Sequence, residues 1–274
     1  QDRGLIRYLM RHRHTTPFEM VEIKFHCKMP IFVARQWVRH RTANINEYSL
    51  RYSEARDDFY IPKKEHIQFQ SALNKQGRMG EVSDELKKKV QSYFEEISDR
   101  SFEIYSELNQ AGVARELARA VLPVNLYTEW YWKNDLHNLL HFVGLRSDSH
   151  AQYEIRVFSD AMAESIKAVA PFAWEAYQDY AVKGLRFSRI EQGILEQNLP
   201  NRVIDDLVGD VDYQITATLH SNKPRKEEDL FPLYQQQGGK DTVEDFNLKW
   251  ESGEIKTGNV RELREFKGKL TSLK

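Results

Sequence analysis

The fold of this chain is decided by one stretch, VEIKFHCKMPIFVARQWVRHRTANINEYSLRYS (residues 21–53). Its first part alternates apolar with polar residues, which is the period of a β-strand with one buried face. The apolar positions are Val21, Ile23, Phe25, Cys27 and Met29. Pro30 stops the ladder of a strand and can open a helix, so we expect a helix over residues 31–41. The remainder is rich in Asn, Ser and Thr, which is typical of a loop.

Further elements follow on both sides of this stretch. Apolar residues at helical spacing predict a helix over residues 3–13, and Ser83 can cap a long helix that ends at Gly112. The aromatic-rich residues 125–133 indicate a strand. Further helices are predicted over residues 113–121, 135–146 and 151–170, and a last one begins near Pro171 and ends before Gly184. The pattern indicates a helix-rich α+β fold.

The composition is that of a soluble globular protein. Of the 274 residues, 41% are hydrophobic and 30% are charged, and the net charge is −1. A balanced charge gives no long-range field for polyanions, so any anion site must come from local clustering. The single cysteine, Cys27, suits a reducing compartment, and no apolar run reaches the length of a membrane span. We therefore expect a cytoplasmic protein without a membrane partner.

The character of the chain changes near residue 188. The segment 188–274 is charged and weakly periodic, and it contains the turn-prone pieces SNKPRKEED (221–229) and QQQGGKD (235–241). We expect a domain over residues 1–187 and an appendage of peripheral helices and loops over 188–274.

An Arg/His cluster with interspersed amides and hydroxyls occupies residues 39–53. Such a cluster at a helix end is often only a solvated cap that complements the helix dipole. Here three arginines surround Glu47, so the set can also clasp a phosphate and contact the rest of a flat, phosphorylated ligand. No Gly-rich phosphate loop accompanies it, which argues against Rossmann and P-loop sites.

Several ordered blocks within residues 3–183 resemble the flavin-dependent thymidylate synthases. The signature is RHRTANINEYS (39–49), and the other blocks are HTTPFE (14–19), PIFVARQWVRHR (30–41), NEYSLRYS (46–53), ARAVLPVNLYTEWYW (118–132) and LRSDSHAQYEIR (145–156). The resemblance implies a helix-rich catalytic domain with an antiparallel sheet, and a homotetramer with active sites at subunit interfaces. The family's N-terminal strand and loop, with an Ala-Arg-Val-Ser-like segment near the flavin, have no counterpart before the first helix.

The resemblance also implies the reaction and its site. FAD and dUMP stack together, methylenetetrahydrofolate supplies the carbon, and NADPH reduces the flavin, so that dUMP is reductively methylated to dTMP. The positions that match FAD contacts are Thr16, Arg39, His40, Arg41, Glu47, Asp135, Leu136, His137 and His141. The positions that match dUMP contacts are Gln36, Trp37, Val38, Arg39, Glu47, Tyr48, Ser49, Leu50, Arg51, Arg119 and Arg146.

The chemistry of these residue types fits those roles. Ser49, Arg51 and loop N–H groups can cradle a phosphate, with Arg119 as a second cation. The family places the arginine matching Arg146 against the pyrimidine. There a guanidinium favours the N3-deprotonated uracil and makes C5 a better nucleophile. We therefore assign Arg146 the catalytic role.

Other readings of single residues remain. Cys27 could be a thiolate nucleophile, although its strand position favours an inert core residue. Ser49 would need an aligned base to act as a nucleophile. His137 and His141 are spaced for a metal, but we favour flavin contacts and no metal, with His14 and His150 as weaker flavin candidates. The alternative function is a nucleic-acid-binding module built on the Arg/His cluster and the aromatic strand.

Overall fold

The computed structural model describes residues 2–72, 77–220, 242 and 260–273. The chain forms two compact units. The larger unit is Leu9–Lys183, and the smaller unit combines Gln1–Tyr8 with Gly184–Lys274. Helix α1 (Asp2–Arg11) begins in the smaller unit and ends in the larger one. The turn-prone pieces at 221–229 and 235–241 lie outside the described residues.

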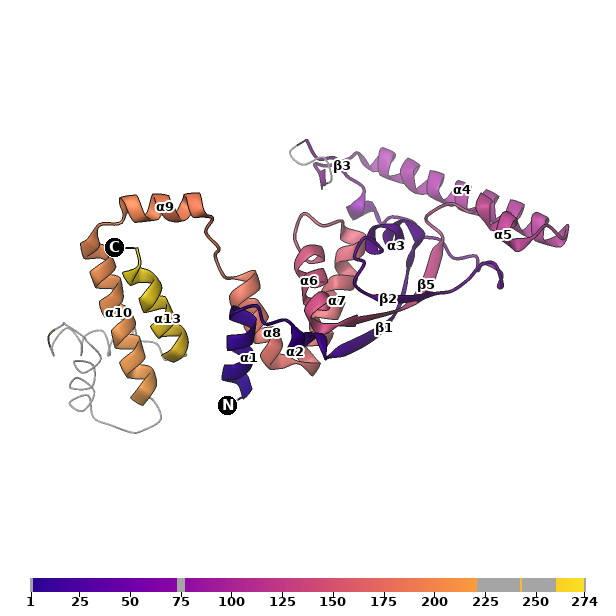
Figure 1. Cartoon of the computed structure of the whole chain (residues 1–274). Coiled ribbons are helices and arrows are strands. Elements are labelled where there is room, and N and C mark those ends of the chain that lie inside the picture. The colour runs from indigo at the N-terminus through magenta and orange to yellow at the C-terminus, as the bar shows by residue number, and fades with distance from the viewer. Residues whose placement is uncertain (1, 73–76, 221–241, 243–259, 274) are drawn as a thin grey trace. The chain divides into compact units, whose positions relative to one another are not determined.

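A three-stranded antiparallel sheet forms the centre of the larger unit, in the order β1-β5-β2 (Figure 1). The strands are β1 (Glu22–Pro30), β2 (Asn44–Glu47) and β5 (Tyr127–Asp135). The predictions of β1, of β5 and of an antiparallel sheet are confirmed. The loop predicted over β2 is wrong, because the backbone of this Asn-rich segment pairs with β5 and the tertiary pairing overrides its low strand propensity.

One face of the sheet is buried under helices. Trp130 of β5 lies edge-on to Trp37 of α3 (Ile31–Trp37), with ring centroids 5.4 Å apart. Trp37 also stacks on Phe142 of α6 (Leu136–Arg146) at 5.0 Å. Helix α7 (Tyr153–Val169) packs against α6, and α8 (Pro171–Tyr177) packs against α7. These rings form the core that fixes α3 and α6 on the sheet.

Helix α3 is shorter than the predicted 31–41. It ends at Trp37, and its last turn is tightened by backbone hydrogen bonds from Arg39 N to Gln36 O (3.3 Å) and from His40 N to Trp37 O (2.9 Å). His40 is buried against α6, and this tertiary contact draws the chain away from the helix axis. The cluster that follows therefore lies in a turn and not on a helix.

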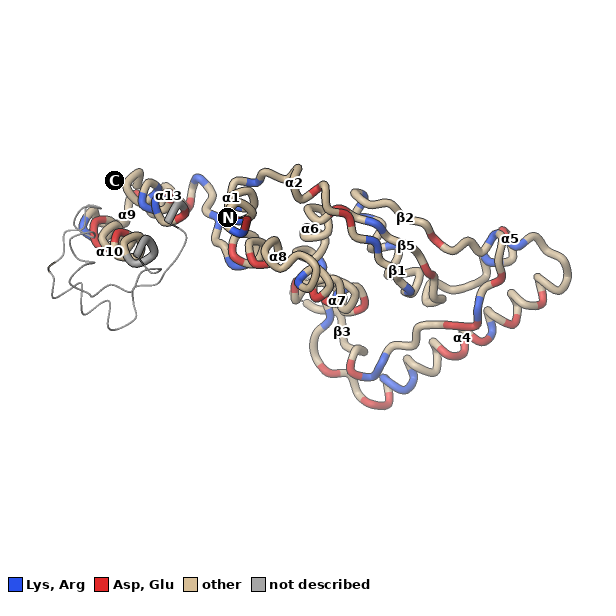
Figure 2. Tube along the Cα trace, turned by 90° about the horizontal axis from the view of Figure 1, so that it is seen from below, with Lys and Arg blue, Asp and Glu red and all other residues tan. Residues whose placement is uncertain are grey.

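Helix α4 (Asp84–Gln110) is capped as predicted, because Ser83 Oγ accepts from Leu86 N at 3.3 Å. Gly112 has φ +80°, a left-handed conformation that glycine adopts without strain, and the helix has ended before it. Figure 2 shows both basic and acidic residues along α4. A short hairpin, β3 (Phe69–Gln70) with β4 (Arg78–Met79), precedes it.

The remaining predicted helices are partly subdivided. Residues 113–121 form α5 (Arg115–Ala118) and the 3₁₀ turn η2 (Arg119–Val121). Helix α8 continues into a π-helical turn, η3 (Gln178–Val182), where an α-helix ending before Gly184 was predicted. Two short helical elements were not predicted, namely α2 (Thr16–Glu19) and the 3₁₀ turn η1 (Lys64–His66), and the β3–β4 hairpin was not predicted either.

The smaller unit contains helices α9 (Arg189–Asn198), α10 (Asn201–His220) and α13 (Val260–Thr271). Ser188 and Glu191 form a capping box at the start of α9. Buried Ile204, Val211 and Ile215 of α10 pack with Leu270 of α13. Within the described part of the chain, no helix is both long and apolar enough to cross a bilayer.

Candidate functional site

His40 connects the turn after α3 to the start of α6. Its ring is buried, and Nε2 lies 3.1 Å from the backbone oxygen of Asn138. A carbonyl oxygen only accepts, so Nε2 carries the proton and Nδ1 keeps its lone pair. Burial lowers the pKa of His40 below its usual value, and the positive charge of Arg146 acts in the same direction. The imidazole is therefore neutral at pH 7.

The first turn of α6 gathers further predicted flavin contacts. Asp135 caps this helix, because its carboxylate accepts from Asn138 N at 2.9 Å and from Asn138 Nδ2 at 2.8 Å. The His141 ring lies 5.4 Å from the His40 ring, and His137 is half-buried nearby on the same helix. Leu136 is buried, and its backbone N–H already donates to Val21 O at 2.8 Å. Thr16 is exposed at the start of α2, which packs against α6.

Arg39 and Arg41 flank His40 and are exposed. Neither forms an ion pair with any residue in the described ranges. Two uncompensated guanidinium groups beside a neutral imidazole are suited to a diphosphate, because guanidinium forks bind phosphate oxygens in a bidentate manner.

Arg146 is the last residue of α6 and is half-buried. Its Nε is buried and has no hydrogen-bond partner among the described residues. Burial lowers the pKa of this guanidinium, which still stays charged at neutral pH. The adjoining Ser147 Oγ lies 2.8 Å from Ser159 Oγ of α7, which anchors this end of the helix. A buried donor without an acceptor is costly, so the site favours a ligand that supplies one.

Gln36 and Trp37 lie on the buried side of α3. The Oε1 atom of Gln36 is buried without a partner in the part of the chain that the structure describes. The Trp37 side chain is fully buried in the core, so any ligand contact would come from its backbone. Val38, which follows, is exposed.

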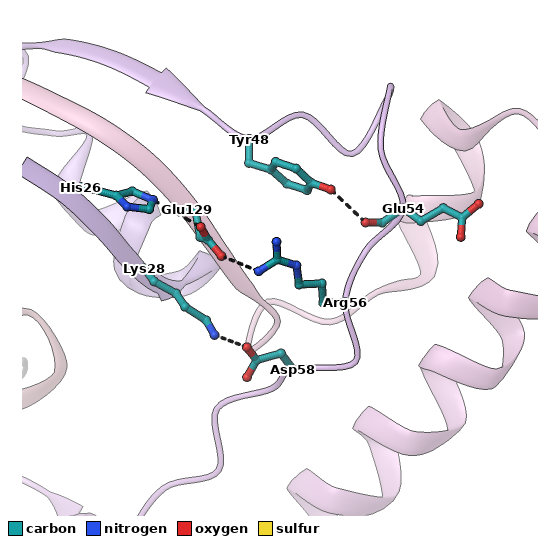
Figure 3. Close-up of polar contacts among 7 residues, drawn as sticks. All are labelled: His26, Lys28, Tyr48, Glu54, Arg56, Asp58 and Glu129. Atoms are coloured by element: carbon teal, nitrogen blue, oxygen red, sulfur yellow. Dashed lines mark hydrogen bonds and ion pairs between the residues drawn. The ribbon is translucent and has the colours of Figure 1, made fainter.

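The segment after β2, residues 48–58, is fastened to the outer face of the sheet (Figure 3). Tyr48 Oη donates to the backbone oxygen of Glu54 at 3.2 Å. Arg56 Nη1 donates to Glu129 Oε1 at 3.1 Å, and Lys28 pairs with Asp58. These contacts hold the intervening Ser49, Leu50 and Arg51 in a defined turn.

Arg51 and Arg119 are brought together by Glu116. Arg51 Nη2 lies 3.6 Å from Glu116 Oε2, and Arg119 Nε donates to the Glu116 backbone oxygen at 3.4 Å. Both arginines are exposed. Ser49 Oγ accepts from Arg51 N at 3.3 Å, which orders the turn in front of them. The turn and the two cations that were predicted to hold a phosphate therefore lie close together.

The predicted residues thus fall into two groups at opposite ends of β5. His40 and Asp135 belong to the first group. Ser49, Arg51 and Arg119 form the second group, and the chain just before it is held to β5 because Tyr48 N donates to Glu129 O (2.8 Å). Asp135 lies six residues beyond Glu129 on β5, a span of about 20 Å.

A cavity of about 690 Å³ lies elsewhere in the larger unit, between α4 and the chain around residues 60–70. None of the predicted site residues lines it. Its buried carboxylate, Glu154, is already bound by Tyr60, Arg78 and Gln152, and its wall is mainly apolar. Nothing in its lining marks it as the predicted site.

Cys27 is buried on β1, and burial raises its pKa to about 11, against a smaller opposing effect of Trp130. A thiol in this state is a poor nucleophile. The candidate histidines differ in their surroundings. Exposed His150 Nδ1 lies 2.8 Å from Asp148 Oδ1, and no group of three potential metal ligands occurs within the described ranges.

Sequence reasoning missed two residues that contact the predicted site. Asn138 offers its backbone oxygen to His40, and Thr128 Oγ1 donates to Glu47 Oε1 at 2.7 Å. Thr128 stands on the buried face of an aromatic strand. Thr128 alternates with Trp130 and Trp132 on this face, and a buried hydroxyl requires a hydrogen-bond partner. The sequence could therefore have indicated that Thr128 contacts another polar residue.

The α+β scaffold thus brings exposed arginines, a neutral buried histidine and a capped helix start near one another. Residues 1–172 match the model of the family described as "Thymidylate synthase complementing protein". The flavin-dependent thymidylate synthase of Rickettsia conorii is 53% identical over 202 residues, which cover 69% of this chain and 69% of the relative. That of Ehrlichia ruminantium (strain Gardel) is 53% identical over 197 residues, which cover 72% of this chain and 66% of the relative.

Solved structures agree with these matches. The UMP/dUMP methylase PolB from Streptomyces cacaoi bound with 5-Br UMP is 36% identical, with a TM-score of 0.62, and the match covers 65% of this chain and 82% of that one. The same enzyme bound with 5-Br dUMP gives a TM-score of 0.60 at 36% identity, covering 65% and 79%. The chain belongs to the flavin-dependent thymidylate synthase family. The family predicted from the sequence is confirmed, and the chain spans about two thirds of the length of these curated relatives.

Proposed function

We propose that this chain reductively methylates dUMP to dTMP, with methylenetetrahydrofolate as the carbon donor and NADPH as the source of reducing equivalents through FAD. Support comes from family membership and from the structural relatives, which are methylases bound to 5-bromouridylates. The observation that carries the proposal is the half-buried Arg146 guanidinium, whose Nε lacks an acceptor among the described residues. A uracil ring supplies such an acceptor.

The residues at the start of α6 fit FAD. Arg39 and Arg41 offer uncompensated cations for its diphosphate. His40 offers the Nδ1 lone pair, and exposed Thr16 and His141 add hydrogen-bonding groups. FAD, when bound, takes hydride from NADPH and delivers it to the one-carbon unit. The chain's own part is to bind and orient, because these groups neither donate hydride nor form a covalent bond.

The protein residues activate the nucleotide by electrostatics. Ser49, Arg51 and Arg119 hold the phosphate, while Arg146 stabilises negative charge on the pyrimidine and raises the electron density at C5. In the overall reaction, C5 gains a bond to the methylene carbon, that carbon gives up its bonds to the folate nitrogens, and the C5 proton is released to solvent. Cys27 takes no part, since its thiol is buried with a pKa of about 11.

We further propose a homotetramer whose sites lie between protomers, in the cytoplasm. The separation of the two residue groups along β5 supports this arrangement, because a nucleotide held by Arg51 and Arg119 of one copy could reach Arg146 of another. The single buried cysteine is compatible with a reducing compartment.

The reaction is tested with purified protein. We expect a yellow protein that bleaches with NADPH under anaerobic conditions and releases tritium from [5-³H]dUMP when methylenetetrahydrofolate is present. A colourless protein that releases no tritium, and that binds oligonucleotides with an affinity falling steeply with salt, would instead support the nucleic-acid-binding alternative.

The shared site is tested by subunit mixing. Arg51→Ala and Arg146→Ala proteins are each expected to be inactive, and co-refolded or co-expressed mixtures should regain part of the activity, because some sites then combine one intact group from each copy. The control is Arg51→Ala mixed with Arg119→Ala, which damages the same group in both copies and should stay inactive. Activity confined to the unmixed wild type would exclude sites shared between copies.

A further inference from the structure

One hydrogen bond ties the core of the sheet to a predicted ligand contact. Thr128 Oγ1 of β5 donates to Glu47 Oε1 of β2 at 2.7 Å. Thr128 is buried, with 8% of its surface exposed, whereas Glu47 is exposed. The hydroxyl therefore cannot reorient to water, and it fixes a carboxylate that solvent alone would leave free to rotate.

The strand pairing sets this contact. Glu47 is paired with Trp130, so its side chain lies on the same face of the sheet as Thr128, two residues along β5. The neighbouring Glu129 lies on the opposite face, where Figure 3 shows it between His26 and Arg56. A hydroxyl at residue 128 is thus suited to reach Glu47.

Only one oxygen of Glu47 is used in this way. Within the described ranges, Oε2 forms no hydrogen bond or ion pair, and it remains available as an acceptor. Glu47 stands two residues before Ser49, at the entrance of the turn proposed to hold the phosphate. The sugar and base of dUMP have two hydrogen-bond donors, the 3′-hydroxyl and ring N3–H. Because Arg146 is proposed to favour the deprotonated ring, the sugar hydroxyl is the donor that remains.

We infer that Thr128 is a positioning residue that orients the Glu47 carboxylate, so that its second oxygen accepts a hydrogen bond from the 3′-hydroxyl of the bound nucleotide. The inference rests on the proposed function, since it requires dUMP at this site. Thr128 itself touches no ligand and acts only through Glu47.

The test compares Thr128→Val with Thr128→Ser in the FAD-loaded protein. Valine keeps the shape and removes the donor, whereas serine keeps the donor. Calorimetric titration with dUMP should show binding weakened about 5-fold in Thr128→Val, the effect of about one hydrogen bond, and near wild-type in Thr128→Ser. Thr128→Ala provides a second variant without the donor should valine fold poorly.

A ligand lacking the sugar hydroxyl separates this role from a structural one. Wild type should bind 2′,3′-dideoxy-UMP more weakly than dUMP, and Thr128→Val should not weaken dideoxy-UMP binding further. Glu47→Gln combined with Thr128→Val should likewise be non-additive for dUMP affinity. A merely structural role would lower affinity for both nucleotides equally.

Several outcomes overturn the inference. Equal dUMP affinity in wild type and Thr128→Val would do so, as would failure of serine to restore binding or loss of FAD with unchanged dUMP affinity. A wild-type protein that binds neither FAD nor dUMP would overturn the proposed function together with the inference, whereas the preceding results would leave the proposed function intact.

Discussion

Arg146 occupies surroundings that suit a charge-stabilising role. Its guanidinium is half-buried and its Nε has no partner among the described residues, so the free protein carries a desolvated cation without a matching anion. A uridylate ring that gains negative charge during the reaction would interact with this cation more strongly than the ground-state ring does. This difference between the two states is what accelerates a reaction.

We therefore expect Arg146→Ala to lower kcat/KM for dUMP by roughly 10²–10³-fold, the usual effect of removing one charge-stabilising donor. FAD should stay bound, because its proposed diphosphate contacts are Arg39 and Arg41. Tritium release from [5-³H]dUMP measures the first effect, and flavin absorbance measures the second. Arg146→Lys keeps the charge without the planar fork and should retain an intermediate rate. Wild-type turnover in the alanine variant would remove Arg146 from its role.

Cys27 is expected to be dispensable for chemistry. Its thiol is buried and its pKa is raised to about 11, so at pH 8 almost all of it stays protonated. Cys27→Ala should keep turnover near wild-type while lowering the free energy of unfolding by about 1 kcal/mol through lost packing. Iodoacetamide should label the native protein slowly and the denatured protein quickly. Loss of turnover in a folded Cys27→Ala protein would indicate thiolate attack.

Elements set by local patterns were predictable, and those set by distant contacts were not. The alternation in β1 and the Ser83 cap of α4 are properties of adjacent residues, so the sequence was sufficient for both. Strand β2 exists because it pairs with β5, more than 80 residues later in the chain. The early end of α3 depends on burial of His40 against Asn138, which is 98 residues later in the chain. The spacing of apolar residues along the sequence does not show which distant segment a strand or helix end will contact.

The same limit applies to the candidate site. The Arg/His cluster is visible as a run of residues, and the family resemblance adds Arg119 and Arg146. The hydroxyl of Thr128 was overlooked because its position in an aromatic strand is that of a core residue. Its role depends on where β2 lies, and β2 itself was predicted as a loop.

Gly144 of α6 lies close to Tyr177 of α8. A Cβ at this residue would lie 2.8 Å from Tyr177 Oη, and Tyr177 is buried. Alanine in a helix is normally about 1 kcal/mol more favourable than glycine. Here we expect Gly144→Ala to destabilise the larger unit instead, by about 1–2 kcal/mol, because the buried ring must shift. Urea unfolding followed by tryptophan fluorescence measures the change.

Tyr177→Phe provides the matched background for this test. Removal of Oη removes the atom nearest to the new Cβ, so Gly144→Ala should become neutral or stabilising in Tyr177→Phe protein. An equal loss of stability in both backgrounds would show that the tyrosine hydroxyl is not the obstacle, and that alanine disturbs another contact of α6.

The predicted site residues and the C-terminal appendage lie in different units of the chain. Every predicted contact with FAD or dUMP lies in the larger unit, Leu9–Lys183. The smaller unit has its own apolar core between α10 and α13, and it contains a buried carboxylate that is paired with a lysine. Asp212 has 3% of its side chain exposed, and Lys267 Nζ donates to its two oxygens at 2.7 and 2.8 Å. The stability of the two units should therefore be separable by mutation.

Lys267→Met tests this separation. It leaves the Asp212 carboxylate buried without its cation, which should cost the smaller unit about 3 kcal/mol. Hydrogen exchange should accelerate in α10 and α13, whereas FAD content and dUMP turnover should stay unchanged, because no predicted ligand contact lies in these helices. Replacing both partners, Asp212→Leu with Lys267→Met, removes the stranded charge and should recover most of the protection. A parallel loss of flavin in Lys267→Met would instead mean that the appendage supports the catalytic site.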